Sequence, residues 1–229
     1  MGHGGARVAA DMPKDEFERR VRAFFLEHPE VIVEAINRLE ARQGEQEATE
    51  AQAVLKSRAD EVFRDPDSPV GGNPDGDVTL VEFFDYNCPY CRQVAPLMLE
   101  AEAADPKLRV VFKEFPVLGP SSTFAAKAAL AAHKQGKYLA LHRALMQDRG
   151  AVDEAKVLEA ATAAGLDVDR LKAEAEAPAI QAMLERNLDL ARALRINGTP
   201  GFVVGDKVLV GATDLKGLQT LIGKARDGR

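Results

Sequence analysis

Apolar residues near the start of the chain recur at the spacing of an α-helix. Phe17, Val21 and Phe24 stand at positions i, i+4 and i+7, which is the stripe of an amphipathic helix. Pro29 interrupts this stripe and suits the first turn of a second helix. The second helix would present Ile32, Ala35, Ile36 and Leu39 on one face. The pattern therefore predicts two amphipathic helices that together form an N-terminal arm over residues 14–40.

The apolar stripe fades beyond residue 40. The chain becomes rich in Glu, Gln, Ala and Arg up to about Arg64, which is typical of a solvated helix or spacer. The next stretch, RDPDSPVGGNPDGD, is rich in proline and glycine and predicts a loop or linker. We therefore expect a helical spacer and a Pro/Gly linker over residues 41–76. Residues 1–13 are expected to be disordered or a non-native remnant.

A β-rich pattern follows the linker. The β-branched and aromatic run DVTLVEFFDY predicts a strand near residues 77–85, and KLRVVFKEFPV predicts a second near 107–115. Residues 89–104 between them read as a helix, with Pro96 as an expected kink. A strand, a helix and a strand in this order predict a βαβ unit with parallel pairing and a right-handed crossover.

Residues 121–195 are expected to be almost wholly helical. The expected helix starts are Ser121 or Ser122, Asp153, Asp167 and Pro178. The end of the chain, TPGFVVGDKVLVGATDLKGLQTLIGKARD, reads as a strand, a Gly-Asp turn, a strand and a helix. The fold class is therefore α/β, with residues 77–116 and 196–229 forming one unit and residues 117–195 a helical insertion.

Composition limits the classes of function. The chain has 229 residues, of which 46% are hydrophobic and 29% charged, and a formal net charge of −6. This charge gives no basic footprint for nucleic acid. No apolar run approaches the roughly 18 residues that a membrane span needs. The start lacks the apolar core of a secretory signal, so we expect either a cytoplasmic protein or a mature secreted form.

The two cysteines of the chain, Cys88 and Cys91, both lie in the stretch FFDYNCPYC. The pair could be a redox couple, half of a metal site or a structural clip. Two thiols supply only half of a four-ligand zinc site, and the histidines are scattered. A disulfide that closes so small a loop stabilises a fold little. A Cys-X-X-Cys sequence within a βαβ pattern indicates a thioredoxin-like redox pair instead.

The predicted helix places the two sulfurs differently. If it begins at Cys88 or Pro89, the first sulfur lies at the helix N-terminus, where backbone N–H groups and the macrodipole favour a thiolate. Pro89 suits the first helical position because no N–H is needed there. Cys91 lies one turn further on, shielded, and could act as the resolving thiol. We therefore expect no cofactor and no resident metal at this pair.

A proline precedes the third predicted strand. In the stretch NGTPGFVV, Thr199 and Pro200 stand where a proline would disturb strand pairing. A cis bond here would turn the Thr199 backbone toward the thiols and leave it free to pair with an extended substrate. The alternative is an ordinary turn proline.

The segments VEFFDYNCPYC, FKEFPVLGPSS and GTPGFVV together resemble the DsbA-like thioredoxin-fold oxidoreductases. The resemblance covers roughly Asp77 to Arg229 and implies a thioredoxin fold with a helical insertion that acts on cysteine-containing proteins. It implies that Cys88 is the nucleophile, Cys91 the resolving cysteine, and Thr199-Pro200 a cis-proline loop. The dipeptide between the cysteines is Pro-Tyr rather than Pro-His, and Tyr90 supplies no positive charge, so we expect a less oxidising pair.

The same resemblance assigns roles to two charged residues. Glu82 stands where the family has a buried acid below the active site, and Lys113 stands where a partner cation is expected. Glu82 also alternates with Leu80 and Phe84 on one face of its strand, so it should point inward. A buried carboxylate has a raised pKa and could relay the proton that Cys91 must lose. The alternative is that Glu82 and Lys113 form a structural ion pair.

The arm carries a second resemblance. The stretch DEFERRVRAFFLEHPEVIVEAINRLEARQ resembles the arm of the suppressor-of-copper-sensitivity protein C group. This resemblance implies a homotrimer through residues 14–40 that works as a disulfide isomerase in the periplasm, with a membrane thiol–disulfide reductase as electron donor and a link to copper tolerance. Docking of the arm on the catalytic domain is the alternative to self-association.

Three other functions stay open. The first is a dithiol oxidase that introduces disulfides. The second is a carrier that binds Cu(I) through the soft sulfurs of Cys88 and Cys91. The third is an interaction module whose thiols are inert.

Overall fold

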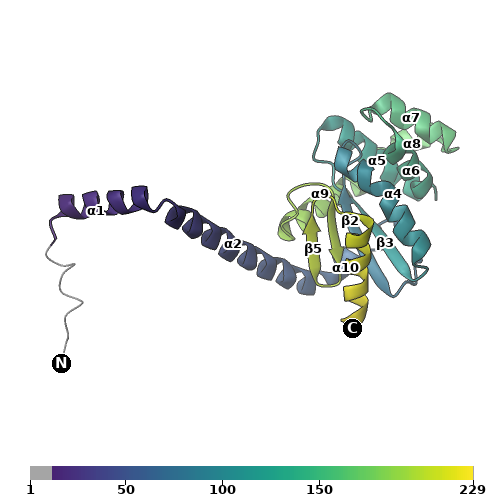
Figure 1. The fold of residues 1–229 in the computed structure, drawn as a ribbon. Helices are drawn as coiled ribbons and strands as arrows, with labels where there is room; N and C mark the ends of the chain where they lie inside the picture. Colours follow the sequence, from purple (N-terminus) through teal and green to yellow (C-terminus); the bar gives the residue numbers. More distant parts are fainter. Residues whose placement is uncertain (1–11, 229) are drawn as a thin grey trace. The chain divides into compact units, whose positions relative to one another are not determined.

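The computed structural model describes residues 12–228, and the chain divides into two compact units between Ala48 and Thr49 (Figure 1). The expectation for residues 1–13 concerns mostly residues 1–11, which lie outside the described range.

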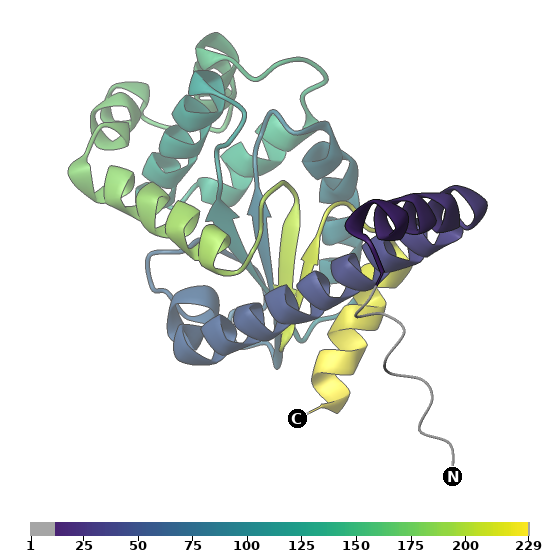
Figure 2. The same cartoon turned by 90° about the vertical axis from the view of Figure 1, so that its left-hand side faces the viewer.

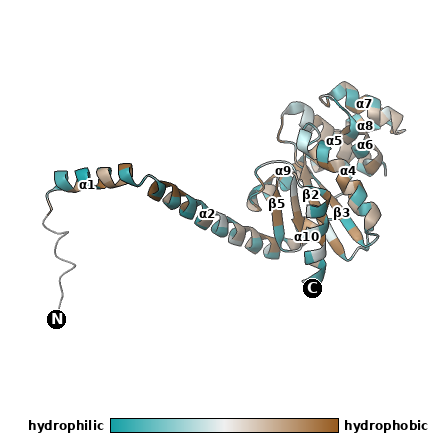
Figure 3. Cartoon of the chain, viewed as in Figure 1, coloured by the Kyte–Doolittle hydropathy of each residue, from teal (hydrophilic) through white to brown (hydrophobic). Residues whose placement is uncertain are grey.

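The first unit consists of the helix α1 (Lys14–Glu27) and the first part of α2 (Glu30–Ser57). Both predicted arm helices are present, and the His28 backbone N–H closes α1 on the Phe24 carbonyl oxygen at 2.8 Å. None of the α1 side chains is buried. Figure 3 shows the apolar positions along α1 and the start of α2. The large apolar side chains exposed here are Phe17, Phe24, Phe25, Leu26, Ile32, Val33, Ile36 and Leu39.

A mixed sheet forms the centre of the second unit. Its strands are β1 (Val70–Gly72), β2 (Val78–Phe84), β3 (Leu108–Glu114), β4 (Gly201–Val204) and β5 (Lys207–Val210), in the order β1-β3-β2-β4-β5. The strands β2 and β3 are parallel and joined by the helix α4 (Pro89–Ala104), so the predicted βαβ unit is confirmed. The other three pairings are antiparallel.

Successive side chains along each strand point to opposite faces of the sheet, so the apolar core is divided into two clusters. Leu80 and Phe84 of β2 pack with apolar residues of α4 and of α10 (Leu215–Asp227). Val81 and Phe83 face the other way, toward a separate cluster. That cluster includes residues from the end of α2, from α3 (Ala59–Phe63) and from α9 (Pro178–Ala193). Figure 2 shows α9 and the end of α2 over this face.

A group of helices is inserted between β3 and β4, as predicted. It comprises α5 (Pro120–Lys134), α6 (Tyr138–Gln147), α7 (Glu154–Ala163), α8 (Val168–Ala175) and α9. Asp153 and Asp167 cap α7 and α8 through hydrogen bonds from backbone N–H groups, as expected. The expected cap at Ser121 or Ser122 is wrong. The helix α5 begins earlier, at Pro120 after Gly119, because proline fits the first helical position.

The segment between the arm and the sheet differs from the expected spacer and linker. Leu55 and Val62 are buried against the sheet, so the second half of the expected spacer is part of the core. Within the expected linker, Val70–Gly72 pairs with β3 as an edge strand. This strand could not be predicted from the sequence, because it is only three residues long, two of them glycine, in a stretch rich in proline. The sheet order and the inserted helices together confirm a thioredoxin fold of the α/β class.

Candidate active site

The first thiol lies at the start of α4. Cys88 occupies the N-cap position, and Pro89 is the first residue of the helix. The Arg92 N–H donates to the Cys88 carbonyl oxygen at 3.2 Å, so the helix ladder begins at this residue. The N–H groups of the first turn, which lack carbonyl partners within a helix, therefore lie next to the Cys88 sulfur. Only 4% of Cys88 is exposed, whereas Tyr90 is 59% exposed.

Cys91 lies behind Cys88 and is fully buried. Both thiols are free in this structure. Burial raises the pKa of the Cys91 thiol strongly, and the nearby Glu82 carboxylate raises it further. The two thiols differ in access, because Cys88 keeps a small exposed fraction and Cys91 has none.

The Thr199-Pro200 loop faces Cys88. The peptide bond between Thr199 and Pro200 is cis, as expected. The Cys88 thiol donates to the Thr199 carbonyl oxygen, with 3.2 Å between sulfur and oxygen. The loop leads directly into β4, which pairs with β2. The sheet thus brings together two segments that the sequence separates by 111 positions.

Glu82 lies on β2 and points into the core, as its alternation predicted. Its cross-strand neighbours are Phe112 and Phe202, so apolar rings flank the carboxylate. Burial raises the Glu82 pKa to about 8, with a further contribution from the negative charge of Glu102. Among the described residues, the Glu82 Oε1 atom has no hydrogen-bond partner.

The expectation that Lys113 is the cation partner of Glu82 is wrong. Lys113 pairs in register with Phe83, so it lies on the opposite face of the sheet from Glu82. Its ammonium donates to the Asp65 Oδ2 atom at 3.0 Å, to the Ser68 hydroxyl at 2.8 Å and to a backbone carbonyl. Lys113 therefore ties the segment before β1 to the sheet and does not reach the thiols.

Two polar side chains that the sequence reasoning missed, those of Asp85 and Arg92, hold the loop before Cys88. The Asp85 carboxylate accepts from the backbone N–H groups of Asn87, Val117 and Leu118 at 2.8–2.9 Å. Arg92 donates to the backbone carbonyls of Tyr86 and Gly150. These bonds join the segment before Cys88 to the loop that precedes α5 and to the loop between α6 and α7. Asp85 and Asn87 are typical turn residues, and this was the signal available in the sequence.

A buried polar cluster lies behind the loop. The hydroxyls of Tyr86 and Tyr138 donate to the Glu114 Oε1 atom at 3.0 and 2.8 Å. The Nδ1 atom of His142 lies 3.2 Å from the Tyr86 hydroxyl. Burial raises the Glu114 pKa well above its usual range and lowers the His142 pKa to about 3. Burial thus favours the uncharged form of both side chains, and His142 is neutral at pH 7.

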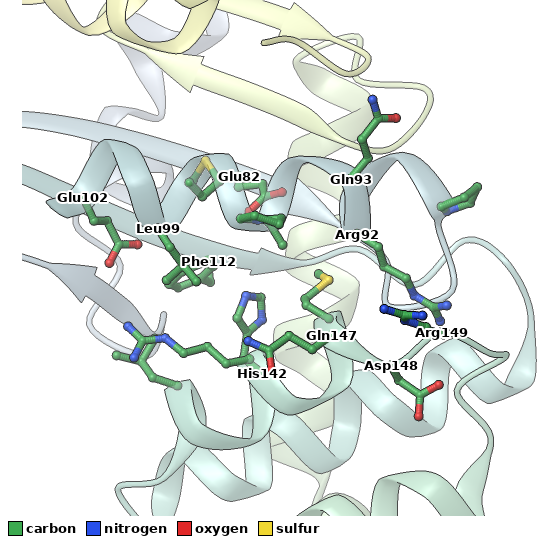
Figure 4. Close-up of a pocket in the computed structure, with 17 residues that line it drawn as sticks. Glu82, Arg92, Gln93, Leu99, Glu102, Phe112, His142, Gln147, Asp148 and Arg149 are labelled. Carbon is green, nitrogen blue, oxygen red and sulfur yellow. The ribbon is translucent and has the colours of Figure 1, made fainter. Parts of the chain in front are cut away.

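A cavity of about 570 Å³ opens between α4 and α6 (Figure 4). Its lining is mostly apolar, with Met98, Leu99, Phe112, Leu139 and Met146 among the residues that form it. Glu82, Glu102 and His142 also line it, and Pro89 borders it. The cavity therefore adjoins the first turn of the helix that carries both thiols.

Within the described chain, His, Cys, Asp and Glu side chains nowhere gather in a group of three or more that could hold a metal ion. The described helices include none that is both long and apolar enough to cross a membrane.

The sheet order, the paired cysteines at a helix start, the facing cis-proline loop and the inserted helices define a thioredoxin-fold protein with a Cys-X-X-Cys site. Family comparison places it more narrowly. The chain belongs to the DSBA-like thioredoxin domain family, whose model matches residues 79–223. The copper resistance protein ScsC N-terminal domain matches residues 14–46. Both resemblances noted in the sequence are thereby confirmed.

Two solved structures are similar over most of their length. A thioredoxin-like oxidoreductase from Silicibacter pomeroyi DSS-3 is 48% identical, covers 73% of this chain and 97% of its own, and gives a TM-score of 0.72. The catalytic domain of Proteus mirabilis ScsC is 34% identical, covers 77% of this chain and 98% of its own, and gives a TM-score of 0.70.

A curated relative is much longer than this chain. The Na(+)/H(+) antiporter NhaA 1 of Salinispora arenicola (strain CNS-205) is 30% identical over 167 residues, which cover 72% of this chain. The match covers 26% of that antiporter, so the chain spans about a quarter of the length of such relatives.

Proposed function

We propose that this protein is a thiol–disulfide oxidoreductase that acts on cysteine-containing proteins. Cys88 is the nucleophile: its thiolate attacks a substrate disulfide and forms a mixed disulfide. Cys91 then attacks Cys88 and releases the substrate thiolate. Pro89 is the first residue of the helix whose N-terminus carries the Cys88 sulfur, and Tyr90 presents a ring without positive charge to the approaching substrate.

The observation that carries this proposal is the position of the Cys88 thiol. It lies at the N-terminus of α4 and 3.2 Å from the Thr199 carbonyl oxygen. A substrate cysteine that bonds to this sulfur would lie beside the backbone of Thr199. That backbone can hydrogen-bond an extended substrate segment as an additional strand. Pro200 is the last residue of this loop before β4.

Glu82 is the acid–base group of the proposal. Cys91 must lose a proton before it can attack, and burial disfavours its thiolate. The Glu82 carboxylate acts on the Cys91 pKa, and its own pKa of about 8 lies close to neutral pH. A base whose pKa is near the working pH transfers protons most effectively.

We propose further that the protein is an isomerase that assembles as a homotrimer through residues 14–40. The exposed apolar side chains of α1 and α2 support self-association, because a soluble chain rarely leaves a contiguous apolar surface uncovered. The match of residues 14–46 to the ScsC N-terminal domain also supports it. Several sites in one assembly can hold a misfolded substrate while its wrong disulfides are exchanged.

An isomerase needs reduced thiols, and this requirement suggests its surroundings. We propose that the protein works in the periplasm, where a membrane thiol–disulfide reductase keeps Cys88 and Cys91 reduced. The family of the arm supports a role in copper tolerance, because copper ions oxidise thiols and create wrong disulfides.

Refolding of scrambled ribonuclease tests the isomerase. We expect the reduced full-length protein to restore ribonuclease activity, and a chain lacking residues 1–40 to be monomeric and to lose this ability while it still oxidises dithiols. Failure of the full-length protein, combined with rapid oxidation of reduced ribonuclease, would instead assign a dithiol oxidase.

Copper binding tests a function of another class. A Cu(I) carrier would bind one ion per reduced chain through both sulfurs, and the Cys88→Ser variant would lose it. We expect no stoichiometric copper under conditions in which the protein exchanges disulfides.

A further inference from the structure

Two carboxylates face the same cavity. Glu82 and Glu102 both line the space of about 570 Å³ between α4 and α6, and Figure 4 shows Glu102 at one end and Arg92 at the other. Cys91, Met98 and Glu102 stand at positions i, i+7 and i+11 of α4, so they share one face of the helix. Glu102 therefore lies about three turns beyond the resolving thiol on the same side.

The inner carboxylate needs a partner from the cavity. Glu82 is 2% exposed, and its Oε1 atom accepts no hydrogen bond from the described residues. A buried polar atom without a partner is costly, and a cavity of this size has room for several water molecules. Water in the cavity would satisfy Glu82 and carry protons away from it.

The outer carboxylate borders both the cavity and solvent. Glu102 is half-buried, and the nearby Gly72 backbone N–H favours the charged form of its carboxyl. The edge strand β1 makes room for it: a Cβ atom added at Gly71 would lie 3.3 Å from the Glu102 Oε1 atom. Burial raises the Glu102 pKa, and the positive charge of Arg143 opposes this rise.

The surroundings of the two carboxylates contain few other groups that titrate near neutral pH. The charged or titratable residues that line the cavity with them are Arg92 on α4, His142 and Arg143 on α6, and Asp148 and Arg149 after α6. Strand β1 has none, and the residues paired with Glu82 on β3 and β4 are phenylalanines. The negative charge of Glu82 also raises the pKa values of three further groups, which are Cys91, Tyr86 and Glu114.

We propose that this cavity is the proton route of Cys91, and that Glu102 is the outer carboxylate that exchanges protons with solvent. The inference rests on the proposed disulfide exchange. When Cys91 attacks the mixed disulfide, its proton passes to the Glu82 carboxylate. A bond forms between the Cys91 and Cys88 sulfurs, the bond from Cys88 to the substrate sulfur breaks, and the substrate leaves as a thiolate. Glu82 then passes the proton through cavity water to the Glu102 carboxylate, which releases it. In the reduction of the pair the proton moves inward by the same route.

This route has a kinetic consequence. Glu102 touches neither sulfur, so it acts through Glu82 and should leave the attack by Cys88 unchanged. The release step should depend on Glu102, because Glu82, with a pKa of about 8, holds a proton near neutral pH that must leave before Glu82 can accept the proton of Cys91. A small buffer base that enters the cavity should replace Glu102, whereas no buffer would repair a purely structural defect.

Dithionitrobenzoate separates the two steps in the full-length reduced protein. Attack by Cys88 releases a first thionitrobenzoate and leaves a mixed disulfide, and attack by Cys91 releases a second. We expect Glu102→Gln to slow the second release roughly tenfold near neutral pH, with imidazole restoring the rate, while the first release is unchanged. Glu82→Gln should slow the second release more, and imidazole should restore it less.

Two further variants control for structural effects. Glu100→Gln changes an exposed carboxyl on the same helix that does not line the cavity, and it should behave as the unmodified protein. Glu102→Asp keeps a carboxylate and should retain most of the second rate. If Glu102→Gln leaves the second release and its pH profile unchanged while Glu82→Gln slows it, the route through Glu102 is wrong. If the first release is absent in the unmodified protein, the proposed exchange chemistry fails instead.

Discussion

The Cys88 thiol donates to the Thr199 carbonyl oxygen at 3.2 Å, across 111 positions of sequence. This contact places the reactive end of α4 against the loop that leads into β4. The fold thus brings a sulfur and a backbone acceptor together, and Cys88 keeps a small exposed fraction while Cys91 has none. This difference in exposure leads to the first prediction.

Cysteine variants should separate attack from resolution. Cys91→Ser keeps the Cys88 sulfur at the helix N-terminus but removes the resolving thiol, so it should accumulate a mixed disulfide with a cysteine-containing peptide. Cys88→Ser should form none, because the remaining thiol is fully buried. Mass spectrometry of the intact protein measures both. Equal trapping by the two variants would contradict the assigned order of the sulfurs.

The stability of the reduced protein should depend on pH through Glu82. Its pKa is about 8 in the folded protein and near 4.5 as an ordinary glutamate, so the folded state binds the extra proton between these values. Stability should therefore fall as pH rises through this window. Relative to Glu82→Gln, the free energy of unfolding should drop by about 1.4 kcal/mol per pH unit between pH 5 and pH 8.

Urea unfolding at several pH values measures this difference. Glu114 has a raised pKa as well, so the Gln variant should keep part of the pH dependence. Parallel stability curves for the two proteins would show that Glu82 titrates normally and is not buried as described.

Lys113→Met should affect stability but not disulfide exchange. The buried ammonium of Lys113 bonds to Asp65 and Ser68, and its loss leaves the partly buried Asp65 carboxylate without its cation. We expect the free energy of unfolding to fall by about 2–3 kcal/mol. The rate of exchange should stay within about twofold, since Lys113 lies on the sheet face opposite Glu82.

The double variant with Asp65→Asn provides the control for Lys113. It removes the charge that the single variant leaves unpaired, so it should regain part of the lost stability. A large loss of exchange rate in Lys113→Met would contradict the conclusion that Lys113 has no part in disulfide exchange.

Tyr90→His should make the pair more oxidising. Tyr90 is exposed in the first turn of α4, where an imidazolium would stabilise the reduced form through the Cys88 thiolate. We expect the equilibrium constant with glutathione to shift by about tenfold, which is about 30 mV for two electrons. Tyr90→Phe, which adds no charge, should differ little from the unmodified protein. A shift of equal size in Tyr90→Phe would attribute the effect to packing.

Single charges in the arm should dissociate the proposed trimer. Phe24→Asp and Ile36→Asp each place a carboxylate among the exposed apolar side chains of α1 and α2. Sedimentation should show the mass of one chain, and isomerisation should be lost while dithiol oxidation remains. Glu40→Asp is a matched control at an exposed acidic position and should stay a trimer. If either variant remains oligomeric, the apolar face that carries the substituted residue is not the interface.

Periodicity and turn chemistry were enough to predict the features that depend on neighbouring residues. These features are the amphipathic arm helices, the strand on which Glu82 alternates inward, and the helix that starts at Pro89. Each follows from an apolar repeat of 2 or 3.6 residues or from the residues at a helix end. The caps at Asp153 and Asp167 are equally local. Resemblance in three short segments then correctly predicted the fold and the cis bond before Pro200.

The tertiary structure decided which residues meet across the fold. Lys113 turned out to bind Asp65, 48 positions away, because strand register sent it to the face opposite Glu82. Leu55 is buried because it packs against the apolar side chains on that face of the sheet. The cavity that joins Glu82 to Glu102 exists because α6 lies beside α4 and the strands β2 and β3, and no repeat along the chain encodes that arrangement. Local preference acts over a few residues, whereas burial depends on segments that only folding brings together.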